Sequence, residues 1–150
     1  MTTVTELGPR LGIAPTCAAL GLPRAQLHPL IADAVWPEFL RGRYDTAVFN
    51  ALREVEIAVR TSGNYTAAEF GDRLIRQAFH EDTGPLRDRA ALPAERLALS
   101  HLFAGAFGCF SNPPRHRQVG IDPVQATEII TLASLLMRIV DERAQANRTP

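Results

Sequence analysis

Apolar residues recur every three or four positions along most of this chain, which is the spacing of one face of an α-helix. No stretch alternates convincingly between apolar and polar positions, as a half-buried β-strand would, and no internal repeat is visible. The pattern therefore predicts an all-α domain, a helical bundle of about five helices. We place these helices at about residues 29–41, 44–63, 66–79, 93–110 and 122–143.

Capping and helix-breaking residues define the ends of the first three helices. Pro37 lies inside the first helix, and we expect it to kink or divide that helix. Gly63 supplies the stop of the second helix. Thr66 and Glu69 form the Ser/Thr-x-x-Glu pattern of a capping box, so we expect the third helix to open there and to bury Phe70.

The last two helices flank a proline-containing turn. The apolar stripe of the fourth helix consists of Leu97, Leu102, Phe103, Ala106, Phe107 and Phe110. The fifth helix has Asp122 as its N-cap and Pro123 at its first helical position. Its apolar face consists of Ala126, Ile129, Ile130, Ala133, Leu136, Met137 and Val140. This face is wider than one neighbouring helix usually needs, so the helix is either central in the bundle or also part of a dimer interface.

The distribution of proline and glycine predicts the domain organisation. Residues 1–26 are expected to form a loosely structured arm with at most a short helix, and residues 27–145 the compact helical domain. Residues 80–92 are polar and rich in turn formers, which indicates a loop. The polar tail after Arg143 is expected to fray, with 146–150 outside the domain.

Size and charge limit the classes of function. The 150 residues, 46% of them hydrophobic, are enough for one domain whose core needs no disulfide or metal. The 16 basic residues, all of them arginine, are balanced by 16 acidic residues. A net charge of zero argues against a protein that coats nucleic acid through one large basic surface, so any contact with RNA must be local.

Compartment and cofactors follow from what the sequence lacks. No apolar run approaches the roughly 20 residues that span a bilayer, and the start has no signal-peptide pattern, so we expect a cytoplasmic protein with no membrane partner. Cys17 and Cys109 stand in no metal or redox spacing and are interpreted as reduced thiols. His28, His80 and His101 show no metal-ligand spacing, so the sequence predicts no metal and no cofactor.

The turn between the fourth and fifth helices carries the strongest candidate chemistry. Asn112 and the two prolines after it stop the helix and stiffen the turn, and His116 follows between Arg115 and Arg117. A histidine between two fixed cations suits a phosphate ligand. The alternative is an ordinary helix stop whose arginines keep the loop soluble.

Four further residues have both a structural and a functional interpretation. Glu56 and Arg60 stand one helical turn apart, which is more typical of a solvated ion pair than of a pair lining a groove. Trp36 and Tyr44 have the ring systems that stack on nucleic-acid bases, although a core or interface role is commoner.

The run from residue 27 to residue 141 resembles the bacterial Ymh family. The matching blocks are Leu27-His28-Pro29, Gly42-Arg43-Tyr44-Asp45-Thr46-Ala47-Val48, Val55-Glu56-Ile57-Ala58-Val59-Arg60, Leu102-Phe103-Ala104-Gly105-Ala106, Phe110-Ser111-Asn112-Pro113-Pro114-Arg115-His116-Arg117 and Ala133-Ser134-Leu135-Leu136. Several blocks in the same order are far more specific than any one of them. The family is similar to the HEPN superfamily of all-α bundles.

This resemblance implies a helical dimer that acts on RNA. Many HEPN proteins are metal-independent endoribonucleases of toxin–antitoxin systems and of antiviral defence by abortive infection. Their hallmark is an arginine, a polar residue and then a histidine. Asn112 matches the polar residue and His116 the histidine, whereas Ser111 stands where similar sequences carry the arginine.

The implied catalytic residues are therefore His116, Asn112 and Ser111, with Arg115 and Arg117 as phosphate-binding residues. His116 would move the proton of an RNA 2′-hydroxyl or of the leaving oxygen. Three explanations of the missing arginine remain: a flanking arginine replaces it, the second copy in a dimer supplies a cation, or Ser111 is an introduced change. The expected partners are RNA, a second copy of the chain, and an antitoxin or defence-system protein. The rival hypothesis is a non-catalytic helical module that binds a partner protein or a nucleotide.

Overall fold

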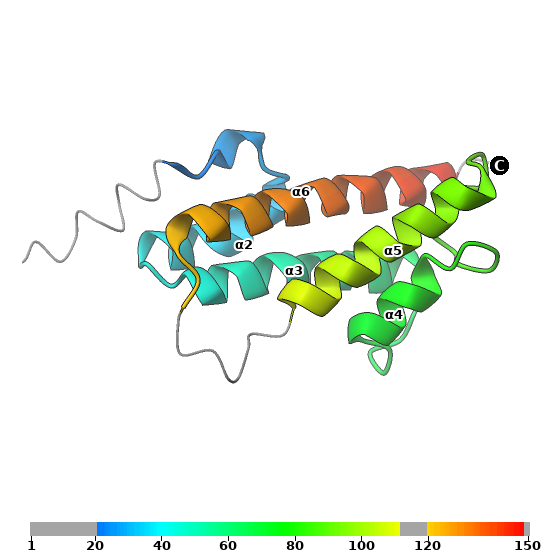
Figure 1. Cartoon of the computed structure of the whole chain (residues 1–150), viewed down its shortest axis with the longest axis horizontal. Helices are drawn as coiled ribbons and strands as arrows, with labels where there is room; N and C mark the ends of the chain where they lie inside the picture. Colours follow the sequence, from blue (N-terminus) through cyan, green and yellow to red (C-terminus); the bar gives the residue numbers. More distant parts are fainter. Residues whose placement is uncertain (1–20, 112–119, 149–150) are drawn as a thin grey trace, which may run out of the picture.

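The computed structural model describes residues 21–111 and 120–148, and this part of the chain contains helices and no strand (Figure 1). A short 3-10 helix, η1, precedes five α-helices. The elements are η1 (Arg24–Gln26), α2 (Pro29–Leu40), α3 (Tyr44–Ser62), α4 (Gly71–Ala78), α5 (Pro93–Phe110) and α6 (Pro123–Ala146). The prediction of an all-α bundle of about five helices is confirmed.

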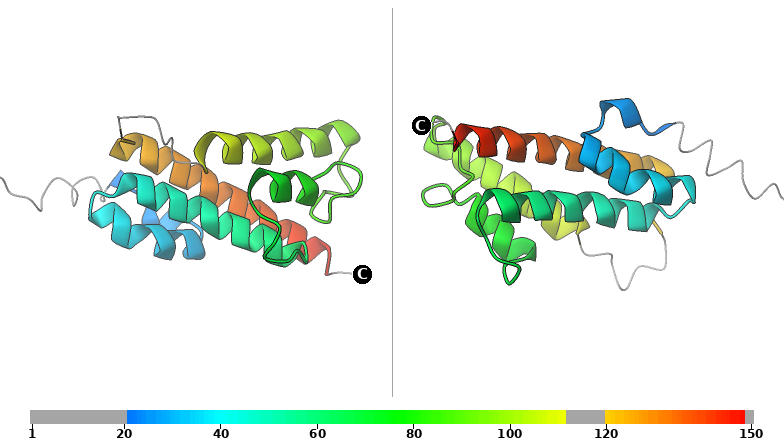
Figure 2. Two further views of the ribbon diagram at one scale, coloured as in Figure 1. Left: turned by 90° about the horizontal axis from the view of Figure 1, so that it is seen from below. Right: turned by 180° about the vertical axis from the view of Figure 1, so that it is seen from behind.

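Helix α3 lies at the centre of the packing. It packs along α6 and α2 on one side, and α4 and α5 lie against its other side (Figure 2). The two groups share one continuous hydrophobic core, in which Phe79 and Phe103 stack with ring centroids 3.8 Å apart. Leu86, from the loop between α4 and α5, is also fully buried and closes the core on that side.

Helix α6 supplies the broadest apolar face, as its pattern predicts. All seven predicted positions are buried, namely Ala126, Ile129, Ile130, Ala133, Leu136, Met137 and Val140. The face packs on α3 and α2 of the same chain, and α3 rather than α6 is the helix that contacts all the other α-helices. Among the described residues, α6 is also long and apolar enough to cross a membrane by length and composition, and 44% of that window is buried in the bundle.

The predicted effect of Pro37 on α2 is partly wrong, because the helix is not divided and runs on to Leu40. His28 precedes this helix, and its ring Nδ1 accepts a hydrogen bond from the Leu30 N–H. Pro37 lies in the last turns with its ring exposed, so it displaces no packed neighbour. Pro37 has no N–H to donate to the carbonyl four residues earlier, so the helix continues with one intrahelical hydrogen bond fewer.

The predicted start of α4 is also wrong. The helix begins at Gly71, and Phe70, which was expected in the core, is 68% exposed. Gly71 has φ +63°, a left-handed conformation that a helix cannot run through. Half of the predicted capping box forms, because the Glu69 carboxylate accepts the Thr66 N–H while the Thr66 hydroxyl accepts the N–H of Ala68. These bonds close a separate turn ahead of the helix.

Two further predictions need correction, one for the end of α6 and one for the apolar stripe of α5. The tail after Arg143 does not fray at once, because α6 continues to Ala146. Arg143 forms an ion pair with Asp88, and the Asn147 side chain donates a hydrogen bond to the Pro85 carbonyl. On α5, the predicted stripe is buried at Phe103, Ala106 and Phe107, whereas Leu97 and Leu102 are 39% and 43% exposed.

Candidate functional site

The candidate site predicted from the sequence lies on the connection between α5 and α6. Asn112, Arg115, His116 and Arg117 lie outside the described residues. Ser111 is described, as are residues 120–122 at the other end of the connection. The structure therefore defines how the connection is attached to the bundle at each end.

Ser111 closes the C-terminal end of α5. Its backbone N–H and its side-chain Oγ both donate to the carbonyl of Phe107, at 3.0 Å and 2.6 Å. The hydroxyl therefore adds a second donor to a carbonyl of the last helical turn that already accepts the Ser111 N–H. A serine used in this way supplies no positive charge at position 111.

The other end of the connection is attached to the start of α3. The backbone N–H of Ile121 donates to Asp45 Oδ1 at 3.1 Å, between residues 76 positions apart in the sequence. Immediately afterwards, Asp122 Oδ1 accepts the N–H of Gln125 at 2.8 Å and caps α6 as predicted. Sequence reasoning missed the contact of Asp45, because an aspartate in the first turn of a helix is ordinary and gives no sign of a distant partner.

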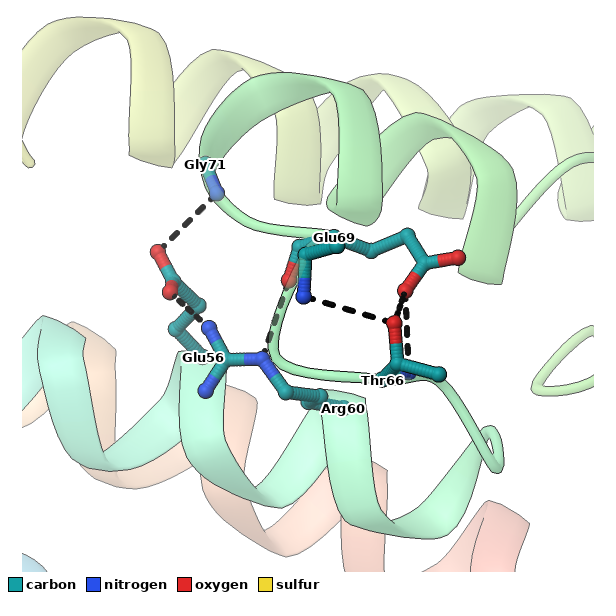
Figure 3. A network of polar contacts seen from close by, with 6 residues as sticks. Glu56, Arg60, Thr66, Glu69 and Gly71 are labelled. Atoms are coloured by element: carbon teal, nitrogen blue, oxygen red, sulfur yellow. Dashed lines mark hydrogen bonds and ion pairs between the residues drawn. The ribbon is translucent and has the colours of Figure 1, made fainter.

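Glu56 and Arg60 form a part-buried link between α3 and the turn before α4, which corrects their interpretation as a solvated pair (Figure 3). Each side chain is 22% exposed. Besides pairing with Arg60, Glu56 accepts the N–H of Gly71 at 3.1 Å, and Arg60 Nε donates to the Glu69 carbonyl at 2.9 Å. The pair fixes the backbone on both sides of Phe70 and so sets where α4 begins.

The turn held by this link has two groups with shifted pKa values. The hydrogen bond from the Thr66 hydroxyl lowers the pKa of Glu69, an effect that desolvation partly opposes. Partial burial raises the pKa of Tyr65, and the negative charge of Glu69 adds to this.

A groove of about 630 Å³ runs along the outer side of α4 next to this turn. Its lining consists of Tyr65, Glu69, Asp72, Arg73, Arg76, Gln77, His80 and Thr83. Arg76 is paired with Asp72 at 2.7 Å, and His80 Nδ1 accepts the backbone N–H groups of Asp82 and Thr83. These polar groups largely satisfy one another, so the groove presents no concentration of one charge.

The remaining singled-out residues have structural partners or lie at the surface. His28 Nε2 is 2.8 Å from Asp141 Oδ2, and its backbone N–H donates to the Ser134 hydroxyl at 2.7 Å. Both contacts attach the start of α2 to α6. His101 and Cys109 are exposed on α5. Within residues 21–111 and 120–148, no group of three His, Cys, Asp or Glu side chains is placed to hold a metal ion.

The two aromatic residues proposed to stack on bases are engaged within the chain. The guanidinium of Arg24 lies 4.7 Å from the ring centroid of Trp36. Tyr44 packs edge-on against Phe39, with centroids 5.0 Å apart. The core or interface interpretation therefore holds for Tyr44. In Trp36, one face of the ring is covered by the Arg24 guanidinium.

The fold and the two attachment points define a small all-α protein. The residues of its candidate site, Ser111 to Arg117, belong to the end of α5 and the connection to α6. The profile of a family described as "Protein of unknown function (Hypoth_ymh)" matches residues 25–140. Because the match covers more than half of the chain, the protein belongs to this family, and the predicted resemblance to Ymh is confirmed. Comparison with curated proteins gives no match, and comparison with solved structures gives none either.

Proposed function

We propose that this protein is a HEPN-like, metal-independent endoribonuclease or a catalytically degenerate descendant of one, acting in phage defence or a toxin–antitoxin system. The observation that carries the proposal is the position of the Asn112 to Arg117 segment in an all-α Ymh-family fold. The segment joins α5 to α6, and described contacts hold the chain just before and just after it, at Ser111 and at Ile121. A short connection attached at both ends suits a site that must present a few side chains together.

The proposed reaction uses the substrate's own 2′-hydroxyl as the nucleophile. His116 takes the 2′-hydroxyl proton or protonates the leaving 5′-oxygen, and such proton transfer contributes about 10²–10⁴-fold to a rate. Arg115 and Arg117 bind the phosphate whose charge rises as the bond forms, and Asn112 positions it by hydrogen bonds. The products would carry a 2′,3′-cyclic phosphate and a 5′-hydroxyl.

One observation favours the second candidate, a non-catalytic module that binds a nucleotide or a partner protein. Ser111 carries no charge, and its hydroxyl is used by the Phe107 carbonyl at 2.6 Å. In the HEPN reaction the motif arginine faces the developing phosphate charge, and displacement of such a group by about 1 Å costs about 10²-fold in rate. A site that keeps the histidine but lacks this cation is suited to binding without turnover.

The proposal includes a cytoplasmic homodimer, and α5 has the surface for self-association. The exposed side of α5 from residue 97 to residue 109 carries no charged residue. It consists of Leu97, Ala98, His101, Leu102, Gly105, Gly108 and Cys109. A Cβ added at Gly105 or at Gly108 would meet nothing within 4 Å, so a second helix can approach closely there. An antitoxin or another defence protein would be a further partner.

The test is cleavage of a labelled RNA pool in EDTA by the unchanged protein, by Ser111→Arg and by His116→Ala, with the product ends identified. We expect cyclic-phosphate products either from the unchanged protein or only after Ser111→Arg, and none after His116→Ala. Activity gained by Ser111→Arg would identify a site that lacks one cation. Absence of cleavage by both the unchanged protein and Ser111→Arg would reject the nuclease and favour the binding module.

A further inference from the structure

An exposed stripe along α3 contains three side chains, Phe49, Arg53 and Ile57, for which the described part of the chain shows no hydrogen bond or ion pair. Asp45, Phe49, Arg53 and Ile57 are spaced four residues apart and therefore follow one another along one side of the helix. All four are exposed, and Phe49 and Ile57 expose 43% and 38% of their surface. An aromatic ring and an aliphatic side chain thus flank an arginine in solvent.

Arg53 differs from most other arginines of the described residues, because it has no hydrogen bond or ion pair there. Its neighbours on the helix are already engaged, since Glu56 binds Arg60 and the N–H of Gly71. In contrast, Arg41 and Arg43 both pair with Glu38. The guanidinium of Arg53 is therefore free to bind an anion from outside the chain.

The stripe begins at the contact between α3 and the α5–α6 connection. Asp45, its first member, accepts the N–H of Ile121 at 3.1 Å. Phe49 and Arg53 follow one and two helical turns further along α3, about 6 Å and 12 Å in rise. Figure 1 shows the start of α3 at the same end of the bundle as the start of α6. In the sequence, His116 lies five residues before Ile121.

We propose that Phe49 and Arg53 form a binding surface for single-stranded RNA, with a base stacked on Phe49 and a neighbouring phosphate bound by Arg53. This inference rests on the proposed RNA-directed function and names strand contacts on α3, the helix to which Ile121 is attached through Asp45. An exposed aromatic ring next to an unpaired arginine is the combination that binds single strands without reading their sequence, because every base offers a flat face and every nucleotide a phosphate.

Binding of a fluorescein-labelled single-stranded RNA of mixed sequence, followed by anisotropy, tests the surface without requiring cleavage. We expect Phe49→Ala to weaken binding about 5-fold or more through loss of one base stack, and Phe49→Tyr to restore it. Arg53→Gln should lower the slope of log K against log salt by about 0.7, the value for one phosphate contact on a single strand, whereas Phe49→Ala should leave the slope unchanged.

Matched controls are available elsewhere on the chain. Phe70→Ala removes another exposed phenyl ring, at the start of α4, and Arg89→Gln removes another exposed arginine, in the loop before α5. Both should bind RNA as the unchanged protein does. Melting temperatures of all variants show whether the bundle is intact, and rescue by Phe49→Tyr separates loss of the ring from loss of the fold.

The outcomes distinguish this inference from the proposed function. RNA binding that depends on Phe49 and Arg53, with no cleavage by any variant, would support the surface and reject the nuclease. Cleavage that depends on His116, with unchanged binding by Phe49→Ala and Arg53→Gln, would keep the nuclease and overturn the surface. Failure of the unchanged protein to bind RNA would overturn it too, and would leave the exposed stripe as a protein contact.

Discussion

Glu69 shows how a single carboxyl group responds to its immediate neighbours. Its Oε2 accepts both the backbone N–H and the hydroxyl of Thr66, at 2.9 Å and 2.5 Å. The hydroxyl contact is the main reason that the pKa of Glu69 lies below its usual value of 4.5. Because the folded-state pKa is depressed, the ionised carboxylate stabilises the turn above about pH 4.5, and this contribution is lost as the pH falls through the folded-state pKa.

The consequence is measurable by NMR titration of the Glu69 carboxyl carbon. In Thr66→Val the carboxylate loses the hydroxyl donor, so we expect its pKa to rise towards the usual value of 4.5. Thr66→Ser keeps the hydroxyl and should leave the lowered pKa in place. Equal titration midpoints in the unchanged protein and in Thr66→Val would show that another group is responsible.

Among the helices, α6 contributes most to the core, and its start depends on one cap. The Asp122 carboxylate accepts the N–H of Gln125 at 2.8 Å. We expect Asp122→Ala to lower the free energy of unfolding by about 0.5–2 kcal/mol, the range for loss of an N-cap. Urea unfolding measures this, and Glu128→Ala, at an exposed position on α6, should change stability by less than about 0.5 kcal/mol. Equal effects of the two substitutions would show that the cap contributes nothing.

The elements that sequence predicts well are those whose signals are local. The start of α6, the stop of α3 at Gly63 and the whole of α5 agree with their predicted bounds, because caps, prolines and apolar periodicity act within a few residues. The start of α4 does not agree. It depends on Glu56, 15 positions before Gly71, and on the left-handed backbone of Gly71 itself. Neither feature is visible in the capping pattern at Thr66 and Glu69.

At the scale of the whole molecule, the proposed dimer can be tested on the exposed side of α5. We expect Leu102→Glu to convert the dimer to a monomer, because it places a charge in an interface that otherwise has none. Leu30→Glu, on α2, is the matched control, since Leu30 is also exposed, at 55%. Sedimentation velocity measures the mass of each. A monomeric unchanged protein, or a dimer that survives Leu102→Glu but not Leu30→Glu, would exclude α5 as the interface.

The candidate site was less accessible to sequence reasoning than the fold. Asn112 and His116 could be named because a polar residue followed by a histidine fits the motif that the resemblance implies. Such a spacing does not show which groups surround the two side chains. Asp45 and Ile121 meet from positions 76 apart. The spacing of Phe49 and Arg53 fits any amphipathic helix, so the sequence alone offers no reason to select them. They become candidates because both are exposed and because Arg53 has no partner among the described residues.

The position of α3 between two groups of helices has a mechanical consequence. One group consists of α2, α3 and α6, and the other of α3, α4 and α5. The connection after Ser111 leaves α5, a helix of the second group, and enters α6, a helix of the first. Its two ends are therefore attached to helices that pack on different sides of α3. A change in the tilt of α5 on α3 would alter the separation of Ser111 and Ile121 while the packing of α6 stayed the same.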